Sequence, residues 1–198
     1  MRSIAPMPCH KVLRDERGAA AIETALALPI VIMVLVGAFE LGGIMITEVL
    51  MEGAVRQASR IGMTNDSYSG LTREQTIREI LQEGTLGFVD IDKATVKKLV
   101  YTDFSSVGKP EPLTYDANGN GRWDPGDTYV EINGNGQWDE DMGKEGLGGP
   151  GDVVLYSVSY DYHSMTGLLS PLFGADGAIT LKASTVIRNE PFNVGSGS

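Results

Sequence analysis

The chain has 198 residues, of which 42% are hydrophobic, and its 26 acidic and 16 basic residues give a formal net charge of -10. This acidity argues against nucleic-acid binding, because few cations are available to neutralise phosphates, and it favours a cation as partner. The single cysteine, Cys9, excludes an intramolecular disulfide. The length is sufficient for one membrane segment and one modest domain with its own core.

Residues 19–39 form a long apolar segment in which Glu23 is the only charged residue. As a helix the segment would be about 32 Å long, close to the roughly 30 Å hydrocarbon core of a bilayer. It is longer than the apolar part of a cleaved secretory signal, and Cys9 precedes it, which argues against a lipoprotein. We therefore expect a retained transmembrane helix, in which Pro29 introduces a slight bend.

Basic residues are distributed unevenly around this segment. Four of them precede it: Arg2, Lys11, Arg14 and Arg17. The first basic residue after it is Arg56. Because an excess of Lys and Arg marks the cytoplasmic side, we expect residues 1–18 in the cytoplasm and the C-terminal part outside it. The sequence thus predicts a single-pass protein of the inner or cell membrane.

The stretch from Arg17 to Arg60 contains a distinctive series of motifs. In chain order these are R-G-A-A-A-I-E-T-A-L-A-L-P (17–29), F-E-L-G (39–42) and A-V-R-Q-A-S-R (54–60). The series resembles the TadE-like minor pilins and pseudopilins of the Tad (tight adherence) pilus system. Leu41, Gln57 and Ser59 are mild departures from the family pattern.

The resemblance implies maturation of the pilin type. A prepilin peptidase would cleave after Gly18, which makes Ala19 the new N-terminus and Glu23 its fifth residue. The resemblance implies that Glu23 then pairs with the α-amine of a neighbouring subunit, since a buried carboxylate and a buried ammonium cost less together than alone. The alternative is that Glu23 simply lies at the membrane edge. The partners implied are the membrane, the peptidase and other pilin or pilus-assembly subunits.

A helical pattern continues after the membrane segment. Leu50, Ala54, Ala58 and Ile61 form an apolar stripe, which predicts a stalk at residues 40–62 that extends the membrane helix without a break. A second helix is predicted to begin at a capping box and to run to about residue 83, with three residues facing inward. The capping pair is Thr72 with Gln75, and the inward residues are Ile77, Ile80 and Leu81.

Three later segments show strand patterns, at 96–104, 153–162 and 179–187. Strands that follow helices predict an α+β domain at residues 63–198, with an antiparallel sheet packed on the stalk. Between the last two strands, the apolar residues 168–173 suggest a hairpin crossing.

The Gly-rich middle contains an internal repeat with a period of 15 residues, at 116–130 and 131–145. Oxygen-bearing side chains stand at positions 1, 3, 5 and 9 of each copy, and glycine stands at position 6. This is the spacing of an EF-hand calcium loop, and it is similar to bacterial dockerin-like and thrombospondin-type calcium repeats. The candidate Ca²⁺ ligands are Asp116, Asn118, Asn120, Arg122 (carbonyl), Asp124 and Asp127 in the first copy, and Glu131, Asn133, Asn135, Gln137, Asp139 and Asp141 in the second.

The second copy departs further from the calcium-loop pattern, because Met142 occupies position 12. We expect Asp141 to compensate. Trp123 and Trp138 occupy the same position in each copy, where the side chain normally turns inward and anchors the loop. The alternative is a solvated acidic loop that binds no ion.

The leading hypothesis is a membrane-anchored pilus-assembly component or minor pilin, not an enzyme, with a calcium-binding loop pair. One alternative is a calcium-dependent surface adhesin or binding module anchored by one helix outside any pilus; an anchored enzyme is another. His10 and His163 are far apart in the sequence, and it contains no recognisable catalytic set. Cleavage after Gly18 would separate the pilin hypothesis from the adhesin hypothesis.

Overall fold

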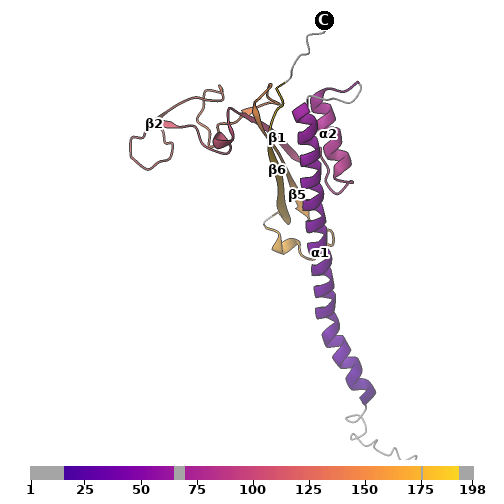
Figure 1. The fold of residues 1–198 in the computed structure, drawn as a ribbon. Helices are drawn as coiled ribbons and strands as arrows, with labels where there is room; N and C mark the ends of the chain where they lie inside the picture. Colours follow the sequence, from indigo (N-terminus) through magenta and orange to yellow (C-terminus); the bar gives the residue numbers. More distant parts are fainter. Residues whose placement is uncertain (1–15, 65–69, 175, 192–198) are drawn as a thin grey trace, which may run out of the picture.

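The computed structural model consists of a long helix with a small α+β domain beside its C-terminal half (Figure 1). It describes residues 16–64, 70–174 and 176–191. Helix α1 (Glu16–Thr64) contains 49 residues, with Pro29 inside it. Among the described residues, α1 alone is long and apolar enough to cross a membrane, and no part of its most apolar window is buried. The predicted fold, one apolar helix continuing into an α+β domain, is confirmed.

Helix α2 (Arg73–Gly84) packs beside the C-terminal half of α1. It begins where the sequence predicted, because Thr72 and Gln75 form the complete capping box. Its inward face also agrees with the prediction, since Ile77, Ile80 and Leu81 are buried. The two helices approach closely where Gly84 meets α1, and a Cβ atom on this glycine would lie 2.8 Å from the Cβ atom of Ala54.

The main sheet is antiparallel, with strand order β4-β1-β5-β6. Its strands are β1 (Thr95–Tyr101), β4 (Lys144–Glu145), β5 (Val153–His163) and β6 (Ala178–Arg188). Strand β1 ends three residues earlier than the predicted residue 104, because Asp103 caps a 3-10 turn, η2 (Phe104–Ser106), through its carboxylate. Strand β5 extends one residue beyond its predicted end, and β6 extends one residue beyond both of its predicted ends.

The hydrophobic core lies between α1, α2 and the sheet, and α1 contacts both β5 and β6. The face that α1 contributes is wider than the predicted stripe, since it includes Met51 and Val55 beside Ala54 and Ala58. Burying a side chain of the size of Met51 or Val55 contributes roughly 1.5–3 kcal/mol. The stalk is therefore one wall of the domain core, and a fragment beginning after residue 64 would lack that wall.

Strand β5 runs back along α1 toward the membrane segment. The Tyr156 hydroxyl lies against Gly62, and the Tyr162 hydroxyl lies against Gly43, just over five helical turns closer to the N-terminus. The connection from β5 to β6, which contains the 3-10 turn η3 (Ser170–Leu172), therefore lies at the end of the domain nearest the membrane segment (Figure 1). The apolar residues 168–173 fall in this connection.

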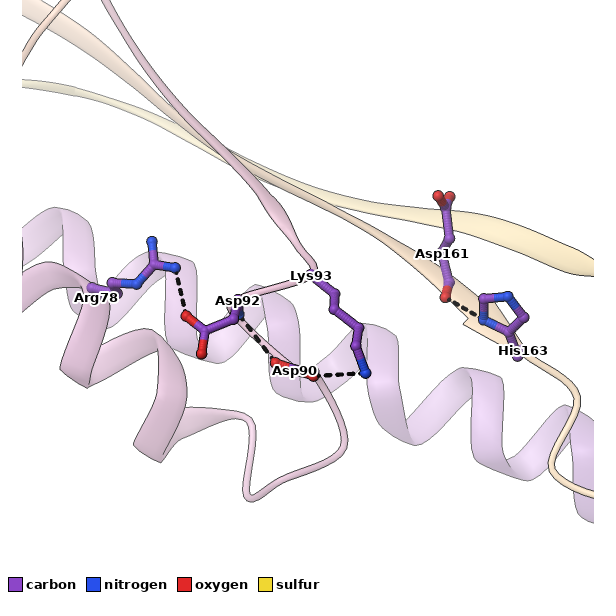
Figure 2. A network of polar contacts seen from close by, with 6 residues as sticks. All are labelled: Arg78, Asp90, Asp92, Lys93, Asp161 and His163. Atoms are coloured by element: carbon purple, nitrogen blue, oxygen red, sulfur yellow. Dashed lines mark hydrogen bonds and ion pairs between the residues drawn. The ribbon is translucent and has the colours of Figure 1, made fainter.

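The ends of the sheet nearer this connection carry exposed polar contacts (Figure 2). Arg78 pairs with Asp92 at 2.7 Å, which joins α2 to the segment before β1, and within that segment Lys93 pairs with Asp90 at 3.0 Å. Exposed pairs of this kind contribute about 0–1 kcal/mol each. His163 is the last residue of β5, and its Nδ1 atom lies 3.0 Å from the backbone carbonyl of Asp161.

The candidate calcium loops form an arm that projects from the other end of the sheet, away from α1 (Figure 1). A small two-stranded sheet of β2 (Leu113–Tyr115) and β3 (Thr128–Tyr129) closes the first loop at its base. The hydroxyls of Thr114 and Thr128 are hydrogen bonded across this pair at 2.8 Å.

Candidate functional site

The first residue of each copy of the repeat organises its loop. Asp116 accepts hydrogen bonds from the backbone N–H groups of Gly119 and Gly121, both at 2.7 Å. Glu131 accepts from the equivalent glycines at 2.7 and 2.9 Å. The bond from Gly121 is the main cause that lowers the pKa of Asp116. Both glycines of the first copy have positive φ angles of 69° and 72°, a conformation that favours glycine.

The ninth residue of each copy faces the asparagines. Asp124 Oδ2 accepts from the side-chain amides of Asn118 and Asn120 at 2.9 and 2.7 Å, and these two bonds lower the pKa of Asp124. Asp139 Oδ2 accepts from the two equivalent asparagine amides, both at 2.6 Å. The two copies therefore share one hydrogen-bonding pattern as well as one spacing.

The first copy is closed by its twelfth residue, Asp127. One carboxylate oxygen accepts from the N–H group of Ala117, the second residue of the copy, at 2.8 Å. The other accepts from the N–H group of Asp124, the ninth residue, also at 2.8 Å. The equivalent residue of the second copy is Met142, which cannot make either bond.

Glu111 occupies that place in the second copy. Its carboxylate accepts from the N–H groups of Ile132 at 2.7 Å and Asp139 at 3.3 Å, the second and ninth residues of the copy. The indole N–H of Trp138 donates to the Glu111 carbonyl at 3.0 Å, and the Glu111 residue is 1% exposed. Glu111 was not among the predicted site residues, because it precedes both copies of the repeat and follows no period.

Asp141 makes its contacts outside the second loop. Its Oδ1 atom accepts from the Tyr101 hydroxyl at 2.7 Å and from the Gly143 N–H group at 3.1 Å. Burial and this carboxylate raise the pKa of Tyr101. Asp141 therefore ties the end of the arm to β1, while Glu111 accepts the hydrogen bonds that correspond to those of Asp127. The role of Asp141 as a Ca²⁺ ligand stays a prediction.

The two copies contact each other through their eighth residues. The rings of Trp123 and Trp138 are stacked, with centroids 5.9 Å apart and an interplanar angle of 9°. Offset stacking of this kind contributes about 0.5–1.5 kcal/mol beyond the buried area. The tryptophans therefore join the two loops into one unit, although Trp123 remains 37% exposed.

The loops offer the class of ligand that Ca²⁺ prefers, oxygen atoms of carboxylates, amides and backbone carbonyls. Among the described residues, however, no group of three or more His, Cys, Asp or Glu side chains is placed to hold a metal ion. The amide nitrogens of Asn118 and Asn120 face Asp124, while their oxygens accept from the backbone N–H groups of Asn120 and Arg122. For the oxygens of Asn118 and Asn120 to bind Ca²⁺, these side-chain amides would have to rotate. Arg122 and Gln137 are candidate ligands only because of their positions in the repeat.

The predicted processing and assembly residues lie near the start of α1. Gly18, Ala19 and Glu23 are exposed, and a Cβ atom on Gly18 would meet nothing within 4 Å. Because α1 begins at Glu16, the predicted cleavage bond lies in its first turn. Residues 1–15 of the predicted leader lie outside the described residues.

Glu40 follows directly on the predicted membrane segment and is 0% exposed. Its carboxylate accepts four hydrogen bonds: from the Ser164 hydroxyl (2.7 Å), the Met165 N–H (3.2 Å), the Thr166 N–H (2.8 Å) and the Thr166 hydroxyl (2.7 Å). Burial raises the pKa of Glu40, but these bonds outweigh it and lower the pKa to about 2. The helical spacing of Glu40 with Met51 and Ala54 is a signal for the face on which Glu40 lies, but nothing in the sequence identifies the β5–β6 connection as its partner.

Part of helix α1 matches a known protein-family model. Residues 18–60 match the family model described as TadE-like protein. The TadE-like segment includes Gly18, Glu23 and Glu40 and ends before α2. No curated protein and no solved structure significantly matches the chain.

The TadE-like segment coincides with the single candidate membrane helix and its extension into the domain. Together these two findings indicate a membrane protein associated with a Tad pilus. The sheet and the arm lie outside the TadE-like segment, so the family match carries no information about their function.

Proposed function

We propose that this chain is a minor pilin or assembly component of a Tad pilus. Residues 19–39 anchor it in the inner or cell membrane, the N-terminus is cytoplasmic and the α+β domain is outside. The observation that supports this proposal is the TadE-like match on a helix whose apolar half projects, unburied, from the domain. In this role the chain is structural and catalyses no reaction.

Maturation and assembly follow from the same helix. Prepilin peptidase cuts between Gly18 and Ala19, and Glu23 then pairs with the Ala19 amine of a neighbouring subunit. Glu23 is exposed on the helix surface, so in a membrane it needs a partner from another molecule or a route to the interface, because an unpaired carboxylate there costs a few kcal/mol.

The mature N-terminus tests this proposal. In cells that carry a Tad prepilin peptidase, mass spectrometry should show a chain beginning at Ala19. Gly18→Leu should block processing, whereas Gly37→Leu is the matched control, since both glycines lie in α1 with open space around them. A chain that still begins at Met1 in such cells would remove the main support for a pilin and favour an anchored adhesin or binding module.

We further propose that the arm binds one or two Ca²⁺ ions outside the cell. The support is the repeated ligand spacing together with the matching contacts of Asp127 in the first loop and Glu111 in the second. A bound cation would reduce the repulsion among the clustered carboxylates and order a Gly-rich chain. Extracellular calcium modules of this kind bind at about 10⁻⁴–10⁻³ M.

Thermal unfolding of the full chain in nanodiscs, with chelator or with millimolar calcium, tests the calcium proposal. Calcium at ten times the dissociation constant of one site adds about 1.4 kcal/mol to the free energy of unfolding, which raises Tm by a few degrees. Asp116→Ala with Asp124→Ala should remove the first site's share, and Glu111→Ala the second's. Glu140→Ala with Glu145→Ala is the control, because it removes the same charge from exposed residues of the arm that are not candidate ligands. If wild type shows no shift and calorimetry shows no heat, the arm is a solvated acidic loop.

A further inference from the structure

The β5–β6 connection, residues 164–177, is fixed at a defined height on α1 by its first three residues. Ser164 and Thr166 are hydrogen bonded to Glu40, and the Met165 sulfur lies 3.6 Å from a Cβ atom placed on Gly43. Gly43 is about 6 Å beyond residue 39 along the helix axis. The interfacial layer of a bilayer is roughly 5–7 Å thick on each side of the hydrocarbon core. The connection therefore lies at the height of the outer headgroup layer.

The composition of this connection suits that layer. The first eleven residues of the connection, 164–174, contain no charged side chain, although 21% of the whole chain is charged, and Asp176 stands beyond them, next to β6. Three large apolar side chains are exposed there: Met165 (51%), Leu168 (55%) and Leu172 (77%). On α1, Leu41 and Met45 are also exposed at the same height, at 61% and 65%. Exposed apolar side chains thus lie on both α1 and the connection directly after the membrane segment.

We propose that the β5–β6 connection is a second membrane contact, which inserts Met165, Leu168 and Leu172 into the outer interface of the bilayer that α1 crosses. The inference rests on the proposed membrane insertion of α1. Because the connection carries no cation, the contact is hydrophobic and needs no anionic lipid. Glu40 links the connection to α1, so the membrane crossing of α1 and the lipid contact of the connection together fix the orientation of the domain above the membrane.

Lipid quenching of a fluorophore tests this contact. The full chain, in a Cys9→Ser background, is placed at one copy per phosphatidylcholine nanodisc that contains lipid spin-labelled near the headgroup. Leu172→Cys carries an environment-sensitive fluorophore. Leu86→Cys is the matched control: Leu86 is 73% exposed and follows Gly84, which packs on Ala54, roughly 20 Å above the membrane segment. Phe39→Cys reports insertion of α1.

We expect quenching at position 172 to be at least about twofold stronger than at position 86, and Glu40→Ala to reduce it by releasing the connection. Equal quenching at positions 172 and 86, with strong quenching at position 39, would overturn the membrane contact and leave the membrane helix intact. Weak quenching at position 39 would overturn both proposals. If position 172 becomes shielded only when several copies share a disc, a neighbouring copy covers the connection, and the lipid contact is wrong.

Discussion

Replacing Glu40 by alanine removes the acceptor of four hydrogen bonds between α1 and the β5–β6 connection. Hydrogen bonds to a charged group contribute roughly 1.5–3 kcal/mol each. The sum overstates the loss, because Met165 and Thr166 are themselves exposed and water can hydrate the groups that are released. We expect Glu40→Ala to lower the free energy of unfolding by about 3 kcal/mol. For a chain of this size that corresponds to about 6–12 °C in Tm.

The loss of stability caused by Glu40→Ala should become smaller as the pH falls. The pKa of Glu40 is lowered from its ordinary value of 4.5 to about 2 in the folded protein. A carboxyl group with a lowered folded pKa stabilises the fold fully above its unfolded pKa and loses that contribution as the pH falls toward its folded pKa. The difference in Tm between wild type and Glu40→Ala should therefore be full at pH 7 and shrink between about pH 4.5 and pH 2.

Near-ultraviolet circular dichroism of the full chain in nanodiscs would follow this unfolding, because the aromatic residues report on the domain while the helix stays in the membrane. Glu48→Ala is the control, since Glu48 is an exposed glutamate two turns further along α1, and it should change Tm by no more than about 1–2 °C. A Tm for Glu40→Ala as close to wild type as that of the control, or a difference that persists unchanged to pH 2.5, would refute this account of Glu40.

Two further predictions concern the membrane helix. Glu23→Ala should leave membrane insertion intact, because removing a charge favours burial in lipid, but it should reduce the amount of the chain recovered in assembled pilus complexes; unchanged recovery would leave Glu23 as an ordinary residue of the membrane edge. A reporter fused to the C-terminus should be active only if it requires export, because the basic residues lie before the membrane segment; strong activity of a cytoplasmic reporter there would contradict the proposed orientation.

Local patterns in the sequence were enough to predict most of the elements. The unbroken α1 was predicted from a charge-poor apolar run followed by an apolar stripe, and α2 from the capping box at Thr72. The alternating residues of β5 and β6 predicted those strands to within one residue at each end. Strand β4 was not predicted, because two residues are too few to show a period.

The sequence by itself determined the long apolar helix, the α+β class and the repeated spacing of oxygen-bearing residues, because each depends on neighbours within one helical turn, one strand or one loop. Only the tertiary structure decided which distant residues complete these features. Glu111 completes the second loop from 21 residues before Ile132, and Glu40 holds a connection more than 120 residues away. Such partners carry no local period; they meet because the chain buries its apolar surface, and the buried carboxylates then require every available N–H and hydroxyl donor.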